Sequence, residues 1–353
     1  MMERVDGEMM TAAVAAAKGH RPHPNPRVGA VVVAGQGRIV GRGGHVGPGN
    51  AHAEVLALTE SGALAQGSTL YVTLEPCAHF GKTPPCTDAI IAAGIARVVV
   101  AREDPDSRVA GRGLDALRRS GIEVETGVGS EEALALDPGY FHQRTTGRPR
   151  VTLKVAMTLD GQIAAADGTS RWISSVEARR DAHQLRSSQD AVMVGAGTLL
   201  ADDPALTVRL DGFEGPQPLP VIVAGHRPIP SSRLVFERTA LVFSPVELDL
   251  PAEVVVVPDA KREKVDLHKM LQILGNRGVV DLLVEGGSSL ASALWEECLV
   301  DHGVVYAAAA LAGGSGRGMF DGAFRTVGDL RRVRFTGIDQ VGPDIRIDFE
   351  GVA

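Results

Sequence analysis

The strongest constraint on the fold of this 353-residue chain is a set of three metal-binding side chains that lie far apart in the sequence. His52 stands two residues before Glu54, Cys77 follows a proline, and eight residues separate Cys77 from Cys86. One imidazole and two thiolates are typical zinc ligands, and three protein ligands leave the fourth tetrahedral position open for water. The fold must therefore bring these stretches together around one point.

The carboxylate of Glu54 favours a catalytic interpretation of this set. His52 and Glu54 stand at the start of a helical pattern, and the two cysteines are expected on the strand-to-helix turn that follows. Glu54 is not a ligand, but it stands where a proton carrier for a zinc-bound water is needed, as in zinc-dependent base deaminases. The alternative is a structural zinc site, which usually has four protein ligands in closely spaced pairs.

Composition narrows the class of protein. The length favours two domains, and 44% hydrophobic residues with only 4% aromatic ones suit Val-, Leu- and Ala-rich α/β cores. A net charge of −7 argues against a general nucleic-acid binder, which needs many contacts from Lys and Arg to phosphate. The start of the chain has no signal-peptide pattern, and no apolar run approaches the roughly 20 residues of a membrane span, so we expect a cytoplasmic protein.

Three cysteines do not make a disulfide framework. Two of them belong to the metal motif. The third, Cys298, falls in an expected helix, 289–299, and we predict it to be a buried and unreactive thiol.

Val- and Ile-rich runs alternate with Ala/Leu helical patterns, which predicts α/β layers around largely parallel sheets. The stretch Thr145–Arg150 interrupts this periodicity, and we place a domain boundary there. Before it we expect strands at 28–33, 69–74, 97–101 and 123–126, and helices near 8–18, 53–61, 87–93, 113–120 and 131–144. After it we expect strands near 151–156, 190–194, 220–224, 239–243, 253–257, 280–285 and 303–307.

The long interval between the two cysteines contains His79 and Lys82. A cation and an imidazole held beside a metal could bind a phosphorylated substrate. The alternative is that both are solvated loop residues, which is the usual state of an isolated His or Lys.

The first half of the chain resembles the deaminase half of the bifunctional deaminase–reductases of riboflavin biosynthesis. The resemblance rests on His23–Gly29, His52–Val55, Ala110–Gly113 and above all Leu74–Cys86, whose long cysteine interval is that family's version of the zinc motif. It implies a cytidine-deaminase-like three-layer α/β/α domain that removes the 2-amino group of 2,5-diamino-6-ribosylamino-4(3H)-pyrimidinone 5′-phosphate. It also implies substrate contacts from Asn25, His45, His79 and Lys82.

The second half contains no further set of metal ligands and no nucleophile–base motif. The turn Glu285–Ser288, between a strand and a helix, would let a backbone approach phosphate, although a plain turn is an equal alternative. Its marked segments resemble, in order, the reductase half of the same family; they are Lys154–Gly161, Ser170–Ile173, His183–Arg186, Val194–Thr198, Ala201–Arg209 and Val284–Leu290.

This second resemblance implies a dihydrofolate-reductase-like α/β domain that uses NADPH to reduce the ribosyl group of 5-amino-6-(5-phosphoribosylamino)uracil to ribityl. Asp202 is our candidate for positioning or protonating the reacting sugar, and it is also expected to meet the cofactor. The substrate would contact Lys154, Ser170, Arg186, Leu206, Arg209 and Glu285. The cofactor would contact Ala156, Trp172, Thr198, Gly287, Ser288 and Ser289.

The sequence therefore predicts a zinc-dependent deaminase domain, 1–146, and an NADPH-dependent reductase domain, 147–353. Its partners are expected to be small phosphorylated pyrimidines rather than nucleic acids or membranes, and the resemblance implies a homo-oligomer of two or four copies. One alternative is a nucleobase or nucleic-acid deaminase whose C-terminal domain only binds. The other is a non-enzymatic chain held together by zinc.

Overall fold

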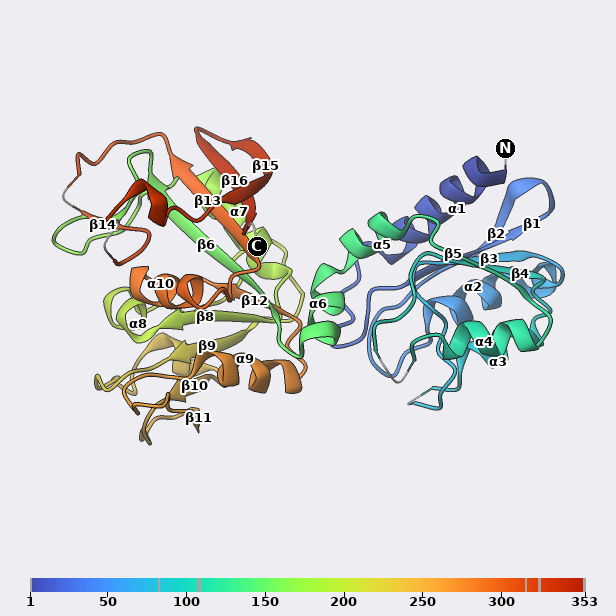
Figure 1. The fold of residues 1–353 in the computed structure, drawn as a ribbon, viewed down its shortest axis with the longest axis horizontal. Coiled ribbons are helices and arrows are strands. Elements are labelled where there is room, and N and C mark those ends of the chain that lie inside the picture. Colours follow the sequence, from blue (N-terminus) through green and yellow to red (C-terminus); the bar gives the residue numbers. More distant parts are fainter. Residues whose placement is uncertain (1, 82, 107–108, 315, 323–324, 352–353) are drawn as a thin grey trace. The chain divides into compact units, whose positions relative to one another are not determined.

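The computed structural model describes residues 2–81, 83–106, 109–314, 316–322 and 325–351. It divides into two compact units, Met1–Gly147 and Arg148–Ala353. Each unit is built on its own sheet (Figure 1). Within the described residues, no helix combines the length and the apolar character that a membrane crossing requires.

The sheet of the first unit has five strands in the order β2-β1-β3-β4-β5. The strands β1 and β2 form an antiparallel hairpin, β1 is also antiparallel to β3, and β3, β4 and β5 are parallel. The bounds of the strands are β1 Gly29–Ala34, β2 Arg38–Gly44, β3 Thr69–Val72, β4 Arg97–Val100 and β5 Glu123–Thr126. The bounds of the helices are α1 Met2–Ala17, α2 Ala53–Ser61, α3 Cys86–Ala92, α4 Arg112–Arg119, α5 Ser130–Leu136 and α6 Pro138–Thr146.

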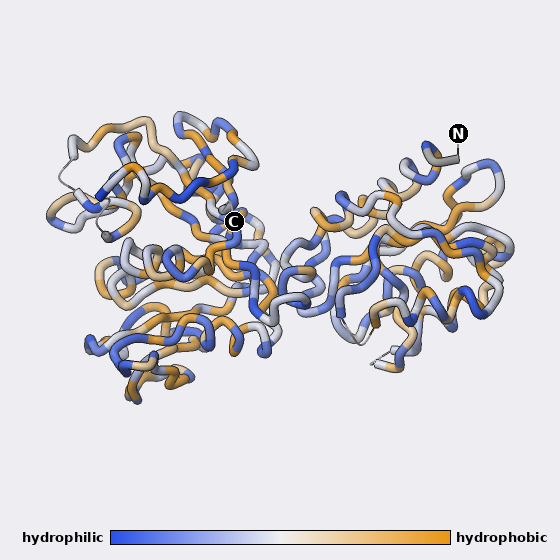
Figure 2. Tube along the Cα trace, in the orientation of Figure 1, coloured by the Kyte–Doolittle hydropathy of each residue, from blue (hydrophilic) through white to orange (hydrophobic). Residues whose placement is uncertain are grey.

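Helices cover both faces of this sheet, which gives three layers (Figure 1). On one face, Met10 and Ala13 of α1 pack with Ala133 of α5 against alternate strand residues such as Val31 and Val99. The helices α2, α3 and α4 lie against the other face. In Figure 2, α4 alternates between hydrophilic and hydrophobic residues, because it buries Leu114 and Leu117 and exposes its arginines to solvent.

Glycines in β2 fix the position of α2. A Cβ atom at Gly43 would lie 2.1 Å from the carbonyl oxygen of Ala53, and one at Gly41 would lie 2.1 Å from that of Ala57. Only glycine permits this approach of helix backbone to strand backbone. The first turn of α2 is thereby held against the sheet.

The second unit has a nine-stranded sheet in the order β11-β10-β9-β8-β12-β6-β13-β16-β15. The seven strands from β11 to β13 are parallel, and the hairpin β15–β16 is added antiparallel at one edge. A small second sheet pairs β7 with β14. The bounds are β6 Arg150–Thr158, β7 Gln162–Ala164, β8 Ala191–Gly195, β9 Leu219–Val223, β10 Leu241–Ser244, β11 Glu253–Val256, β12 Asp281–Val284, β13 His302–Ala308, β14 Arg317–Gly318, β15 Val333–Val341 and β16 Asp344–Gly351.

In the described part of this unit the α-helices are α7 Val176–Ser187, α8 Ala196–Asp202, α9 Leu267–Asn276 and α10 Ser288–Glu296. Leucines of α9 and α10 pack with Val151 and Leu153 of β6 in the largest core cluster. Leu199 of α8 packs with the alternate residues Val192 and Val194 of β8 in a separate cluster. The parallel strands are thus buried on both faces, as continuous Val- and Leu-rich runs predict.

Three expectations from the sequence were wrong in detail. The expected helix 131–144 is two helices, because Asp137 caps α6 and Pro138 begins it. Strand β2 and the C-terminal hairpin were not expected. Cys298 is exposed rather than buried, because α10 ends at Glu296 and Cys298 follows in a left-handed conformation with φ of 55°.

Candidate functional site

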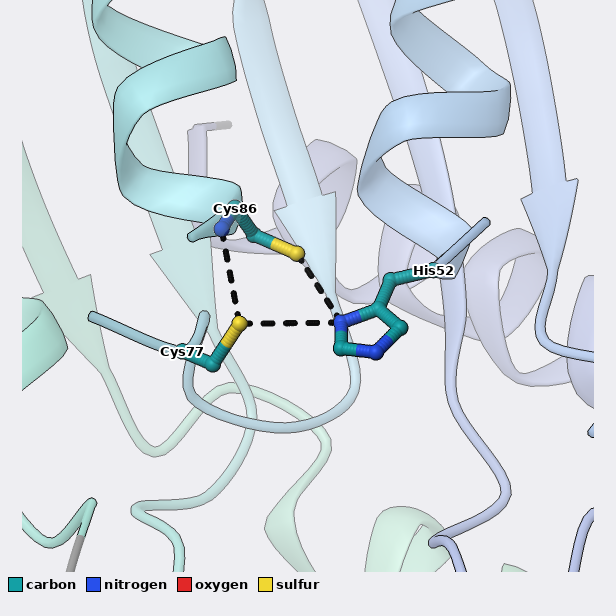
Figure 3. Close-up of side chains that lie close together, drawn as sticks. All are labelled: His52, Cys77 and Cys86. Atoms are coloured by element: carbon teal, nitrogen blue, oxygen red, sulfur yellow. Dashed lines mark hydrogen bonds between the residues drawn. The ribbon is translucent and has the colours of Figure 1, made fainter. Parts of the chain in front are cut away.

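The three expected zinc ligands lie together in the first unit, as Figure 3 shows. His52 is the residue before the first turn of α2, Cys77 lies in the loop after β3, and Cys86 is the first residue of α3. The Nδ1 atom of His52 is 3.1 Å from Sγ of Cys86 and 3.6 Å from Sγ of Cys77. All three ligand atoms lie within 4.8 Å of one another. This donor set and its compactness fit one tetrahedral zinc ion.

The electrostatics of the triad favour a charged sulfur. A hydrogen bond from Cys86 lowers the pKa of the Cys77 thiol; burial opposes this shift, but a further bond from His52 helps to hold the pKa below its ordinary value. The backbone N–H of Cys86 also donates to Sγ of Cys77 at 3.4 Å, at the positive end of α3. A thiolate is the form that binds a metal.

Glu54 lies in the first turn of α2 and is only 3% exposed. Burial, followed by the nearby charge of Cys77, raises its pKa to about 7. A carboxyl group with that pKa can both accept and return a proton near neutrality. The helix thus places a buried carboxyl group beside the triad.

Glu75, which the sequence analysis did not single out as a site residue, holds the turn that carries Cys77. Its buried carboxylate accepts four backbone N–H bonds, from Asp104 at 3.2 Å, Gly111 at 3.0 Å, Gly113 at 2.8 Å and Leu114 at 3.3 Å. Three of these donors belong to the start of α4, where a negative charge is stabilised. A Cβ atom at Gly113 would lie 1.9 Å from the carbonyl oxygen of Pro76, so the turn and the helix are in direct contact.

Two of the four expected substrate contacts in this unit lie beside the triad. The ring of His45 packs edge-on against His52 with centroids 5.0 Å apart, and Asn25 bonds His45 at 3.0 Å. His79 is exposed, and Lys82 lies outside the described residues. Thr83, which was not expected, has its hydroxyl 3.4 Å from Nε2 of His52; its place between the two cysteines was the only sequence signal for it.

In the second unit, all the residues that the sequence analysis assigned to substrate or cofactor line one large cleft. The cleft opens along the carboxyl ends of the parallel strands, which is where open α/β sheets bind ligands. The residues in question are Lys154, Ala156, Ser170, Trp172, Arg186, Thr198, Asp202, Leu206, Arg209, Glu285, Gly287, Ser288 and Ser289.

One part of the cleft carries more positive than negative charge. The guanidinium of Arg186 donates two 2.9 Å hydrogen bonds to the carboxylate of Glu285. Nζ of Lys154 lies 3.9 Å from Oε2 of the same carboxylate. Burial raises the pKa of Glu285, but the charges of Arg186 and Lys154 outweigh that effect and hold the pKa below its ordinary value. The charge of Arg209 also interacts with Glu285, so three cations act on one carboxylate and a phosphate dianion would be attracted there.

Nearby, Ser170 donates to the carboxylate of Asp202, the last residue of α8, at 3.4 Å. The starts of α8 and α10 lie close together: a Cβ atom at Gly287, just before α10, would lie 3.3 Å from the hydroxyl of Thr198 in α8. Helix starts with free N–H groups bind phosphate. Trp172, 66% exposed, presents its ring to the guanidinium of Arg179 at 4.5 Å.

Comparison with known proteins identifies both units. Residues 149–347 match the family model of the RibD C-terminal domain, and residues 3–102 match that of the cytidine and deoxycytidylate deaminase zinc-binding region. The riboflavin biosynthesis protein RibD of Aquifex aeolicus is 40% identical, covering 99% of each chain, and that of Escherichia coli is 40% identical over 93% of this chain and 94% of its own. The chain belongs to the RibD family.

Solved RibD structures agree over the whole length. The RibD of Acinetobacter baumannii superposes with a TM-score of 0.93 at 36% identity, covering 99% of this chain and 100% of its own. A Thermotoga maritima protein, described as a diaminohydroxyphosphoribosylaminopyrimidine deaminase/5-amino-6-(5-phosphoribosylamino)uracil reductase, gives 0.89 at 34% identity with full coverage of both chains. RibD proteins are bifunctional enzymes of riboflavin biosynthesis, so a deaminase with a merely binding C-terminal domain is not supported.

Proposed function

We propose that this chain catalyses two consecutive steps of riboflavin synthesis, each in its own unit. The first is hydrolytic deamination of 2,5-diamino-6-ribosylamino-4(3H)-pyrimidinone 5′-phosphate in residues 1–146. The second is NADPH-dependent reduction of 5-amino-6-(5-phosphoribosylamino)uracil in residues 147–353. The observation that carries the proposal is the meeting of His52, Cys77 and Cys86 beside the buried carboxyl group of Glu54.

In the deaminase unit, His52, Cys77 and Cys86 would hold the zinc ion. Zinc, when bound, lowers the pKa of a water molecule from 15.7 towards about 7. The carboxylate of Glu54 would accept the proton of the attacking water and return a proton to the departing amino nitrogen, which leaves as ammonia. The pKa of Glu54, about 7, suits both transfers.

The pyrimidine would be held next to this carboxyl group by Asn25 and His45. We assign the phosphate to the loop between the cysteines, where His79 is exposed to solvent. Lys82 of the same loop is proposed from the sequence alone.

In the reductase unit, Arg186 and Arg209 would bind the phosphate of the substrate, since guanidinium groups form paired bonds with phosphate. Lys154 would also contact the substrate. Glu285 orients Arg186, and Leu206 and Ser170 would contact the ribosyl group. The carboxyl group of Asp202, bonded by Ser170, would position the sugar or donate a proton to it.

The protein would bind and orient NADPH, which, when bound, would supply the hydride to C1′ of the ribosyl group. The starts of α8 and α10, with Thr198, Gly287, Ser288 and Ser289, fit a pyrophosphate. Ala156, Trp172 and Asp202 would line the rest of that site. A homo-oligomer of two or four copies stays a prediction of the family resemblance, and a cytoplasmic location stays a prediction of the sequence.

Zinc dependence tests the first step. Purified protein is expected to contain one zinc ion per chain and to release ammonia from the diaminopyrimidinone phosphate. Ammonia release should disappear after treatment with a chelator and return when zinc is added. Ammonia release that survives complete removal of zinc would contradict the proposal.

Tryptophan fluorescence tests the cofactor site, because the chain has only two tryptophans, Trp172 and Trp295. Trp172 lines the cleft, whereas Trp295 packs against Phe320 and Phe349. NADPH should quench the fluorescence of Trp295→Phe, which retains Trp172. It should quench Trp172→Phe much less; equal quenching of both variants would remove Trp172 from the cofactor site.

A further inference from the structure

The buried carboxylate of Asp137 joins two parts of the first unit that are far apart in sequence. Its Oδ1 atom accepts a hydrogen bond from Nε2 of His23 at 3.0 Å, and its Oδ2 atom accepts one from the backbone N–H of Arg27 at 2.8 Å. The same side chain caps α6 by accepting from the backbone N–H of Tyr140 at 3.4 Å. The side chains of His23 and Asp137 are only 3% and 2% exposed.

The two loop residues that Asp137 holds flank Asn25, one on each side. Additional bonds run between the same segments: Nη2 of Arg144 donates to the carbonyl oxygen of Pro24 at 3.2 Å, and Nη1 of Arg27 donates to that of Leu136 at 3.3 Å. The loop is thus fixed to the α5–α6 segment both before and after Asn25. Its position depends on that segment rather than on the loop sequence alone.

Asn25 is in turn hydrogen-bonded to His45, whose ring packs against the expected zinc ligand His52. Nδ1 of His45 lies 3.2 Å from the carbonyl oxygen of Ala51, so this nitrogen carries the proton and donates. Nε2 of His45 is therefore an acceptor, and it receives a bond from Nδ2 of Asn25 at 3.0 Å. The amide nitrogen of Asn25 consequently faces His45, which leaves the amide oxygen to accept a bond from an N–H group of a pyrimidine.

We propose that Asp137 is a positioning residue for deamination: it holds the His23–Arg27 loop so that the amide of Asn25 meets the pyrimidine. This inference rests on the proposed function. Asp137 lies outside residues 3–102, which match the zinc-binding deaminase region, so the element that orients the substrate loop is separate from the element that holds zinc. Asp137 also caps α6, the last helix of the first unit in the described residues.

Steady-state kinetics of ammonia release by the full-length, zinc-loaded protein test this role. Asp137→Asn keeps the shape of the side chain but removes its charge and replaces one acceptor oxygen by an NH2 group, so the charge-assisted bonds from both His23 and Arg27 cannot be kept. We expect KM for deamination to rise on the order of 10-fold, with a smaller change in kcat, because a charge-assisted bond that orients the substrate loop is lost. Zinc content and the reduction of supplied 5-amino-6-(5-phosphoribosylamino)uracil should not change.

Two further variants separate positioning from a general loss of structure. His23→Gln removes the loop side of the same bond, should raise KM in the same direction, and serves if Asp137→Asn does not fold. The double variant should show a KM close to that of the single variant with the higher KM, since both changes break the same connection. Asp115→Asn, an exposed carboxylate on α4 paired with Arg118, is the matched control and should leave KM unchanged.

Each other result overturns the inference. Unchanged KM in folded, zinc-loaded Asp137→Asn would show that the loop does not need Asp137. Zinc loss in parallel with the kinetic effect, or fully additive effects in the double variant, would assign Asp137 a merely structural role. If the wild-type protein releases no ammonia, the proposed function fails and this inference fails with it; ammonia release by wild type with unchanged variants overturns only the inference.

Discussion

Replacing Glu75 by glutamine should weaken the first unit and release its zinc at lower denaturant, without affecting the second unit. The carboxylate of Glu75 accepts four backbone N–H bonds, two on each oxygen. Glutamine has one carbonyl oxygen, so it can keep only two of these bonds and must turn an NH2 group towards the other two N–H groups.

The expected size of the effect follows from the bonds that are lost. Hydrogen bonds to a charged group contribute about 1.5–3 kcal/mol each, and two of them are removed in a buried place. The first unit should therefore lose roughly 3–6 kcal/mol of unfolding free energy. Glu8→Gln is the control, because Glu8 is exposed and pairs with Arg4 in an i,i+4 arrangement; it should change stability by less than about 0.5 kcal/mol.

The two units can be followed separately in one urea titration. Both tryptophans, Trp172 and Trp295, belong to the second unit, so their fluorescence reports on that unit alone. Zinc release, followed with a coloured chelator, reports on the first unit. Glu75→Gln should shift the zinc-release midpoint to lower urea and leave the tryptophan midpoint in place. A shift in free energy below about 1 kcal/mol, or an equal shift of both midpoints, would refute the role of Glu75 in holding the turn before Cys77.

Three further predictions concern single carboxyl groups. Glu54→Gln should lower kcat for ammonia release by about 100-fold or more while zinc content and reduction stay normal; retained deamination would remove the proton-carrier role. Asp202→Asn should slow NADPH oxidation with the deaminated intermediate and spare ammonia release; a fall in both activities would contradict the division into two sites. Burial, the largest effect, raises the pKa of Asp104 from 3.8 to about 6. Between these two pKa values the folded state holds a proton that the unfolded state has released. The free energy of unfolding therefore falls as pH rises through this range. Asp104→Asn should therefore gain about 1.4 kcal/mol relative to wild type between pH 5 and pH 8, measured by zinc release in urea; a pH-independent difference would show that Asp104 is ionised at pH 5.

The ligand triad could be predicted from the sequence because ligand chemistry restricts residue type, and because each ligand borders a helix or strand with a clear local pattern. His52 precedes an Ala/Leu helix, and Cys86 begins another. Glu75 and Asp137 could not be assigned a role in this way. The donors to Glu75 lie 29 to 39 residues away, and the loop partners of Asp137 lie 110 to 114 residues away, so no local pattern indicates these bonds.

Elements were missed where tertiary packing overrides local preference. Strand β2 contains three glycines, which disfavour strands in isolation, yet two of them are required where α2 packs against the sheet. The break between α5 and α6 did have a local signal, since Asp137 followed by Pro138 is a typical helix start. The prediction for Cys298 failed because the end of α10 was placed three residues too late.

Residues of the reductase cleft were predicted from family resemblance, since Arg186, Arg209 and Trp172 carry no motif of their own. The segments that follow β8 and β12, with Thr198 and Glu285, come to one cleft because these strands are neighbours in a parallel sheet and end at the same edge. That edge is a consequence of strand order, which hydrophobic patterns do not reveal.

The most direct test of the two-step account is a single reaction followed by two detectors. Purified protein is mixed with the diaminopyrimidinone phosphate and NADPH, and ammonia and absorbance at about 340 nm, where NADPH absorbs, are recorded together. The account predicts ammonia release first and NADPH consumption after it, with both lost in Glu54→Gln and consumption restored by supplying 5-amino-6-(5-phosphoribosylamino)uracil. Ammonia release without NADPH consumption, even when that intermediate is supplied, would contradict a catalytic role for the second unit.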